Sequence, residues 1–305
     1  MDTWRRKFLQ LWVKSKSPRL AIALIFIQLL AFPQWSLSQT KNGVYISFES
    51  SDLNKYQSLI ASLDSKLSSQ HYSAQQPSEV QKGSLIVSIG YDNFVRLLES
   101  KIDNPILAVS ISSASYYEAV SRFGPMNTSA IFLESSPEKQ LRLIRLLSGQ
   151  RKSEVLFLYS AKTTFLIPLI EVAAQKVGNI EVQFVEINSN EQVYSVINSN
   201  NAKWLLAYPD KNIYNQTTLR NVLLSLYKKN QALIGFSQSL ITSGAVGSAV
   251  SSTDDILMQT VEGVNQFAKT GRLPLPEFIK YSSYVLNIPV ARSLNIKTDA
   301  VTSGR

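Results

Sequence analysis

Short β-branched segments alternate with amphipathic segments along most of the sequence, and this alternation constrains the fold more than any other feature. GVYISF at 43–48 predicts a strand, and 52–67 follows with apolar residues at helical spacing. The same order starts again with EVLFLY at 154–159, after the turn at 149–153. Such alternation is typical of parallel sheets with crossover helices. The sequence therefore predicts an α/β protein with two Rossmann-like lobes, parallel sheets and a hinge.

The expected elements follow from these periodicities. Strands are expected at 43–48, 84–89, 105–110, 154–159, 180–187, 203–207, 232–235 and 245–250. Helices are expected at 52–67, 92–98, 137–147, 164–177, 190–198, 219–229 and 253–269. Ser252 or Thr253 can cap the last helix, whose first turn carries Asp254 and Asp255, because a helix start favours acidic residues.

The length of 305 residues suits two domains. We expect a first lobe at 39–150, completed by part of 250–283. A second lobe is expected at 151–249, completed by 284–305. Ligands of such sheets bind beyond the carboxyl ends of the strands, so two lobes that face each other there would form a binding cleft.

Residues 1–38 have the pattern of a secretory signal peptide. A basic region ends at Arg19, and the 13 residues 20–32 are apolar except for Gln28. They would span only about 20 Å as a helix, less than the ~30 Å hydrocarbon core of a membrane. We expect cleavage after Ser38 and a periplasmic protein; a retained membrane anchor is the alternative.

Composition excludes several classes of function. The chain has no cysteine and a single histidine, His71, so thiol catalysis, disulfides, lipidation of cysteine and His-rich metal sites are excluded. The net charge is +9, but much of it lies in residues 1–38, and no basic block remains in the rest of the chain. We therefore expect no nucleic-acid partner, no metal, no cofactor and no enzymatic activity.

Three segments carry a resemblance to a known family: 209–215 (PDKNIYN), 234–237 (IGFS) and 243–245 (SGA), together with the closing 286–296. They resemble the ABC-transporter substrate-binding family, of type I periplasmic-binding-protein fold. The likeness is greatest to short members found near TonB-dependent receptors, and it extends over about 150–297. The resemblance implies two lobes that capture a small solute, with amino-acid-like solutes favoured.

Candidate ligand-binding residues follow the expected strands. Asp210 could accept the ammonium of an amino-acid-like ligand, or could only build a turn with Pro209. The pairs Ser50-Ser51 and Ser112-Ser113 could hold an anion at a helix start, or serve as ordinary helix caps.

Aromatic residues at loop mouths form a second group of candidates. Tyr91 and Tyr159 could each offer a stacking face to a ligand, and Phe236 with Ser237 occupies a comparable position. The alternative is that these side chains pack on neighbouring helices.

Two hypotheses about the function remain. The first is an exported solute-binding protein, expected as a monomer, that serves an ABC permease, a membrane sensor or a TonB-dependent uptake system. The second is an envelope protein-interaction module with a degenerate binding-protein fold. An exported hydrolase would need His71 as its base, and little else in the sequence supports it.

Overall fold

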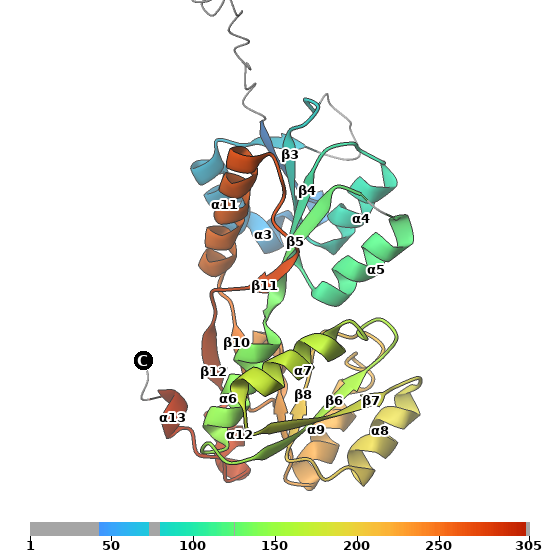
Figure 1. Cartoon of the computed structure of the whole chain (residues 1–305), viewed down its shortest axis with the longest axis vertical. Helices are drawn as coiled ribbons and strands as arrows, with labels where there is room; N and C mark the ends of the chain where they lie inside the picture. Colours follow the sequence, from blue (N-terminus) through green and yellow to red (C-terminus); the bar gives the residue numbers. More distant parts are fainter. Residues whose placement is uncertain (1–42, 73–79, 125, 303–305) are drawn as a thin grey trace, which may run out of the picture. The chain divides into compact units, whose positions relative to one another are not determined.

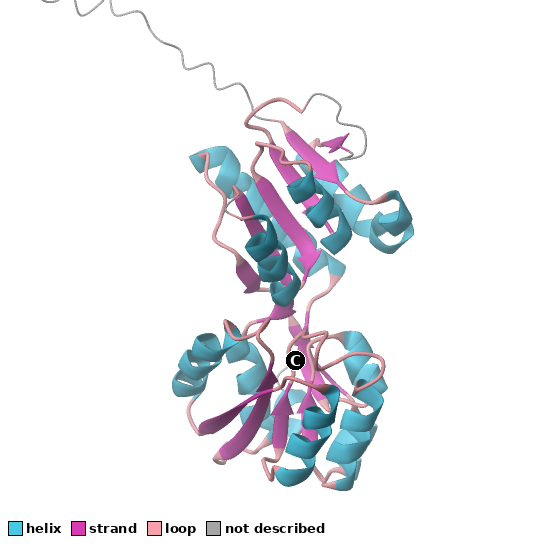
Figure 2. Cartoon of the chain, turned by 90° about the vertical axis from the view of Figure 1, so that its right-hand side faces the viewer, coloured by secondary structure: helices cyan, strands magenta, loops and turns pink. Residues whose placement is uncertain are grey.

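The computed structural model describes residues 43–72, 80–124 and 126–302. The expected signal peptide lies outside the described residues. Within these ranges, no helix is long and apolar enough to cross a membrane. The described chain contains two six-stranded sheets, each with helices on both faces (Figures 1 and 2). The α/β class with two parallel-sheet lobes, expected from the alternating pattern, is confirmed.

The first sheet has the strand order β11-β5-β4-β3-β1-β2, and every pairing is parallel. Its strands are β1 (Val44–Ser47), β2 (Gln70–Tyr72), β3 (Leu85–Ile89), β4 (Ile106–Ile111), β5 (Thr128–Ser135) and β11 (Glu277–Ile279). Both central strands, β3 and β4, are buried at every residue. This burial is characteristic of a parallel sheet covered on both faces.

Four helices cover the first sheet. Side chains of α3 (Leu53–Leu67) and α11 (Thr253–Thr270) pack on one face, with Ile46 and Val87 in that core. On the other face lie α4 (Tyr91–Glu99) and α5 (Ser113–Phe123), which pack against Ile86 and Ala108. Figure 1 shows the two helix pairs on opposite sides of the strands. A short 3₁₀ helix, Ser50–Asp52, precedes α3.

The second sheet has the order β12-β10-β9-β8-β6-β7, in which only β12 is antiparallel to its neighbour. Its strands are β6 (Ser153–Tyr159), β7 (Ile180–Glu186), β8 (Trp204–Leu206), β9 (Ala232–Ile234), β10 (Gly247–Val250) and β12 (Ser283–Leu286). One face packs against α6 (Pro137–Leu147), α7 (Leu166–Val177) and α12 (Ile288–Ser293). The other packs against α8 (Asn190–Ser199), α9 (Leu219–Lys228) and α10 (Gln238–Ser243); a last helix, α13 (Asp299–Thr302), follows α12.

The chain passes between the two sheets three times, at 135–137, 250–253 and 279–283. We call the two sheets with their helices lobe 1 and lobe 2. Hydrogen bonds join the crossing segments: Ser135 Oγ donates to Ser282 Oγ at 2.8 Å, and Ser251 Oγ donates to the Leu133 carbonyl at 3.3 Å. The hydroxyl of Tyr208, from lobe 2, donates to the Ser135 carbonyl at 2.8 Å. The crossings therefore form one hydrogen-bonded junction.

The first crossing comes earlier in the chain than residue 150, the lobe boundary expected from the sequence. Helix α6 buries Leu141 and Ile144 in the core of lobe 2, beside Val155 of β6. The change of lobe is therefore at 135–137. The turn at 149–153 looked like the boundary because the strand–helix pattern starts again there, but it joins two elements of the same lobe.

The periodicity of the sequence predicts neither the helix at 113–123 nor the strand at 128–135. Helix α5 contains serine and two adjacent tyrosines, which blur its apolar stripe. Strand β5 is buried along most of its length and shows no alternation. The short strands β2, β11 and β12 also went undetected, since their pairing depends on distant segments.

Candidate functional site

A cavity of about 160 Å³ is lined by residues of both lobes. From lobe 1 come Ser112, Ala114, Ser115 and Glu118, at the start of α5. From lobe 2 come Pro209, Asp210, Lys211 and Tyr214, which follow β8, together with Lys162 and Phe236. The carboxyl ends of parallel strands are where ligands bind in such sheets. We call this cavity the inter-lobe cavity.

Ser112 forms the lobe 1 wall because it caps α5. Its Oγ accepts from the Ser115 backbone N–H at 3.2 Å and donates to Ser115 Oγ at 2.9 Å. The Ser113 backbone N–H and hydroxyl both donate to Glu134 Oε1, the former at 2.8 Å. Ser112 thus caps α5 and also lines the cavity, whereas the Ser113 hydroxyl donates to Glu134.

Asp210 is buried and held by four donors. Its Oδ2 accepts from the Ser160 backbone N–H at 3.2 Å, the Ser160 hydroxyl at 2.7 Å and the Thr163 hydroxyl at 2.6 Å. Its Oδ1 accepts from the Asn212 backbone N–H at 3.0 Å. These contacts join the loop after β8 to the loop after β6, so Asp210 organises the lobe 2 wall of the cavity.

Tyr214 lies one turn beyond Asp210, and its backbone N–H donates to the Asp210 carbonyl at 2.8 Å. Its ring is 6.3 Å from that of Phe236, centroid to centroid. The Tyr214 hydroxyl is buried and has no hydrogen-bond partner in the described part of the chain. Burial and the nearby Asp210 carboxylate raise the pKa of Tyr214, so the hydroxyl keeps its proton.

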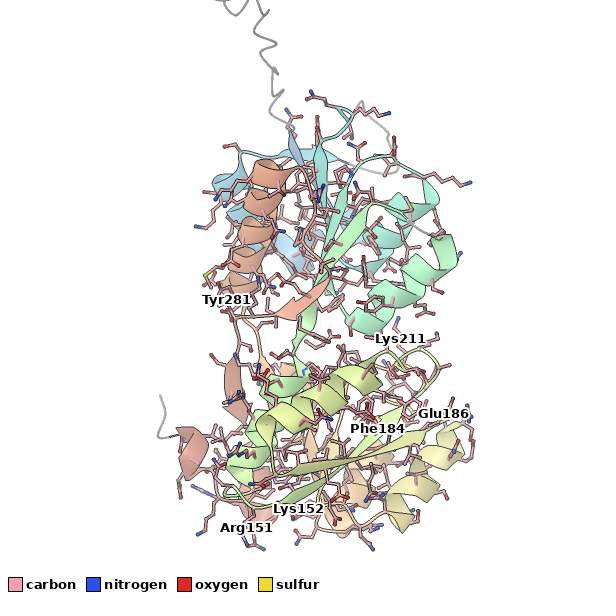
Figure 3. The ribbon with its side chains drawn as sticks, viewed as in Figure 1. Arg151, Lys152, Phe184, Glu186, Lys211 and Tyr281 are labelled. Carbon is pink, nitrogen blue, oxygen red and sulfur yellow. The ribbon has the colours of Figure 1, made fainter. Side chains whose placement is uncertain are left out.

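Three side-chain contacts join the lobes around the cavity. Lys162 Nζ lies 2.7 Å from Glu118 Oε1, and this contact raises the pKa of Lys162. The rings of Tyr117 and Phe165 are 4.6 Å apart. Lys211 Nζ lies 5.1 Å from the centroid of the Tyr91 ring, within cation–π distance. Lys211 is labelled in Figure 3.

Glu134 lies at the carboxyl end of β5, next to the junction between the lobes. It is buried, and its Oε2 has no hydrogen-bond partner in the described residues. Burial raises the pKa of Glu134, because a carboxylate loses hydration there that its hydrogen bonds to Ser113 only partly replace. Burial raises the pKa of Tyr208, and the negative charge of Glu134 raises it further.

The structure brings some of the predicted ligand-binding residues together. Ser112, Asp210 and Phe236 line the inter-lobe cavity. Tyr91 is not among the described residues that line it, but its ring contacts Lys211, which does. Their role in ligand binding stays a prediction.

The other predicted residues lie elsewhere. Ser50 and Ser51 are exposed in the 3₁₀ helix, where they cap nothing. Tyr159 stacks on Phe157 with centroids 6.5 Å apart, and Ser237 caps α10 through a bond from the Leu240 N–H at 3.3 Å. None of these four is among the described residues that line the inter-lobe cavity.

Sequence reasoning missed Tyr214, Lys162, Ser115 and Glu118. Tyr214 was within reach, because it follows Asp210 at a spacing of four residues, about one helical turn. Lys162 and Glu118 carry no sequence signal, since 44 positions separate them and only the fold brings them together.

Other cavities lie apart from the inter-lobe cavity or beside it. One of about 710 Å³ lies at the amino ends of the lobe 2 strands, next to Ser153 and Trp204, where ligands of such sheets do not normally bind. Another, of about 540 Å³, shares Lys211 with the inter-lobe cavity and is lined by Asn188 and Asn212. The described residues hold no cluster of three or more potential metal ligands.

Solved structures share this architecture. A conserved domain protein from Vibrio cholerae matches with a TM-score of 0.56 at 18% identity, over 86% of this chain and 98% of the other. The ABC domain from Streptococcus pneumoniae, solved in complex with L-Trp, matches with 0.57 at 16%, over 86% and 98%. The open substrate-binding protein CD0873 from Clostridium difficile matches with 0.60 at 13%, over 84% and 95%. The chain has the type I periplasmic-binding-protein fold.

The fold implied by the sequence resemblance is thereby confirmed. No family model matches the chain, and no curated protein matches it. Two of the similar structures are described by their binding: one holds L-Trp, and the other is a substrate-binding protein with adhesive properties, here ligand-free and open.

Proposed function

We propose that this chain is an exported solute-binding protein that captures a small molecule between its lobes. The observation that carries the proposal is the inter-lobe cavity, to which both lobes contribute polar side chains at the ends of their strands. Binding proteins of this kind need no catalytic group. The sequence resemblance and the L-Trp complex of the pneumococcal protein favour an amino-acid-like solute.

Closure of the lobes around the ligand would be the change that a membrane partner detects. A ligand that contacts both walls of the cavity binds the closed arrangement better than an open one, and it shifts the equilibrium by that difference in affinity. The three crossing segments are the points about which such a hinge would bend. We further propose a periplasmic location, reached through the signal peptide at 1–38, with an ABC permease, a membrane sensor or a TonB-dependent system as the partner that detects closure.

Thermal unfolding against a panel of solutes tests this function. The purified protein is unfolded with amino acids, sugars, purines, vitamins and siderophores in turn. A solute at 100 times its dissociation constant adds about 2.7 kcal/mol, which shifts the melting temperature by several degrees. A single clear shift supports the proposal. Cooperative unfolding with no shift across the panel contradicts it and favours the envelope protein-interaction module instead.

A further inference from the structure

The acidic groups of the inter-lobe cavity are already occupied by protein donors. Asp210 accepts four hydrogen bonds, from Ser160, Thr163 and Asn212. Glu118 pairs with Lys162 at 2.7 Å. A ligand ammonium at Asp210 Oδ2 or Glu118 Oε1 would therefore compete with contacts that the protein makes by itself.

The cavity side chains that could still form a hydrogen bond or ion pair with a ligand are donors. The Tyr214 hydroxyl is buried without a partner. A buried hydroxyl that makes no hydrogen bond destabilises a fold, and phenylalanine would fill the same space without that cost. Lys211 is exposed, its ammonium contacts the Tyr91 ring, and none of the ion pairs found among the described residues includes it. Both side chains line the cavity from the same loop.

We propose that Tyr214 and Lys211 together bind an anionic acceptor group of the solute, in the first instance a carboxylate. The inference rests on the proposed function and names the chemical class of its ligand. The Tyr214 hydroxyl donates to one oxygen of the ligand and Lys211 supplies the opposite charge, a charge-assisted arrangement stronger than a neutral one. Asp210 then acts as the residue that positions the loop. Because the cavity measures only about 160 Å³, small solutes fit it best.

The first arm of the test needs no ligand. Tyr214→Phe removes the unpartnered hydroxyl, so the melting temperature of the free protein should stay the same or rise. A fall of several degrees would show that the hydroxyl has a structural partner and would overturn the inference. Tyr227→Phe is the matched control, because Tyr227 is 56% exposed on α9 and lies away from the cavity.

The second arm measures binding by calorimetry. The probes are L-alanine, L-leucine, their amides and propionate, together with any solute that the panel identifies. Probes with a carboxylate should bind at least tenfold tighter than the amides. Tyr214→Phe should weaken their binding about tenfold or more, and Lys211→Gln should weaken it and reduce its dependence on salt, while Tyr227→Phe should leave it unchanged.

The outcomes separate this inference from the function on which it rests. A solute that lacks an anionic group, or one whose affinity Tyr214→Phe does not change, overturns the inference and leaves the solute-binding function standing. Failure of every solute to bind the unaltered protein overturns the function, and the inference falls with it.

Discussion

Glu134 shows at the scale of one residue how burial without full hydrogen bonding makes stability depend on pH. Its Oε1 accepts from Ser113, while its buried Oε2 has no partner among the described residues. Because burial raises its pKa, the folded protein holds this proton at pH values at which the unfolded chain has lost it. The contribution of Glu134 to stability is complete below about pH 4.5, the ordinary pKa of the group, and is lost as pH rises through the folded-state value.

Glu134→Gln should remove this dependence, because the amide stays neutral at every pH. We expect the stability of the variant relative to the unaltered protein to increase as pH rises, because only the carboxyl group has to lose its proton in a buried site. Urea unfolding between pH 4 and pH 8 measures the difference. A difference that is the same at all pH values would show that Glu134 keeps an ordinary pKa in the fold.

At the scale of the element, the start of α11 follows from the sequence alone. Ser252 Oγ accepts from the Asp255 backbone N–H at 3.1 Å, and Asp255 Oδ2 accepts from the Ser252 backbone N–H at 2.8 Å. This reciprocal capping box satisfies two donors that a helix start otherwise leaves unpaired. The carboxylate also lies at the positive end of the helix dipole. Asp254 and Asp255 thus lie in the first turn of α11, as the sequence predicted.

Ser252→Ala should lower the free energy of unfolding by about 1 kcal/mol through loss of the cap. Chemical denaturation monitored by circular dichroism measures it. Thr253→Ala is the control, since no hydrogen bond of the Thr253 side chain is found within the described ranges, and it should change stability little. Equal losses in both variants would mean that the cap contributes nothing beyond helix propensity.

At the scale of the whole described molecule, charge is divided unevenly between the lobes. Lobe 1 (43–72, 80–124, 126–135 and 251–282) has 9 Lys and Arg against 12 Asp and Glu, and lobe 2 (136–250 and 283–302) has 14 against 8. Opposite net charges attract, and salt screens them beyond about 10 Å. Lys162 of lobe 2 and Glu118 of lobe 1 form an ion pair between the two oppositely charged lobes. Closure should therefore be favoured by low ionic strength.

Glu118→Gln should weaken closure by at most about 1 kcal/mol, because both partners are partly exposed. The radius of gyration in small-angle scattering should rise in the variant, and affinity for a solute found in the panel should fall by up to about fivefold. Glu99→Gln is the matched control, since Glu99 pairs with Arg122 inside lobe 1. Equal behaviour of the two variants would remove the cross-lobe pair from any role in closure.

The sequence by itself determined the class of fold and the position of most elements. The short apolar run at 154–159 predicts a buried strand, and the helical spacing of apolar residues at 137–147 predicts an amphipathic helix. The residues at strand ends were recognisable for the same reason. Asp210, Ser112 and Phe236 follow strands, and parallel strands end at one edge of a sheet.

Only the tertiary structure decided which lobe α6 joins, how the short strands β11 and β12 pair, and which side chains meet at the cavity. These three features depend on contacts between residues far apart in the chain, and the local periodicity of the sequence carries no information about such contacts. Lys162 and Glu118 look like ordinary surface charges until the fold places them 2.7 Å apart. The unpartnered hydroxyl of Tyr214 is likewise invisible in the sequence, because hydrogen bonding is a property of the surroundings and not of the residue.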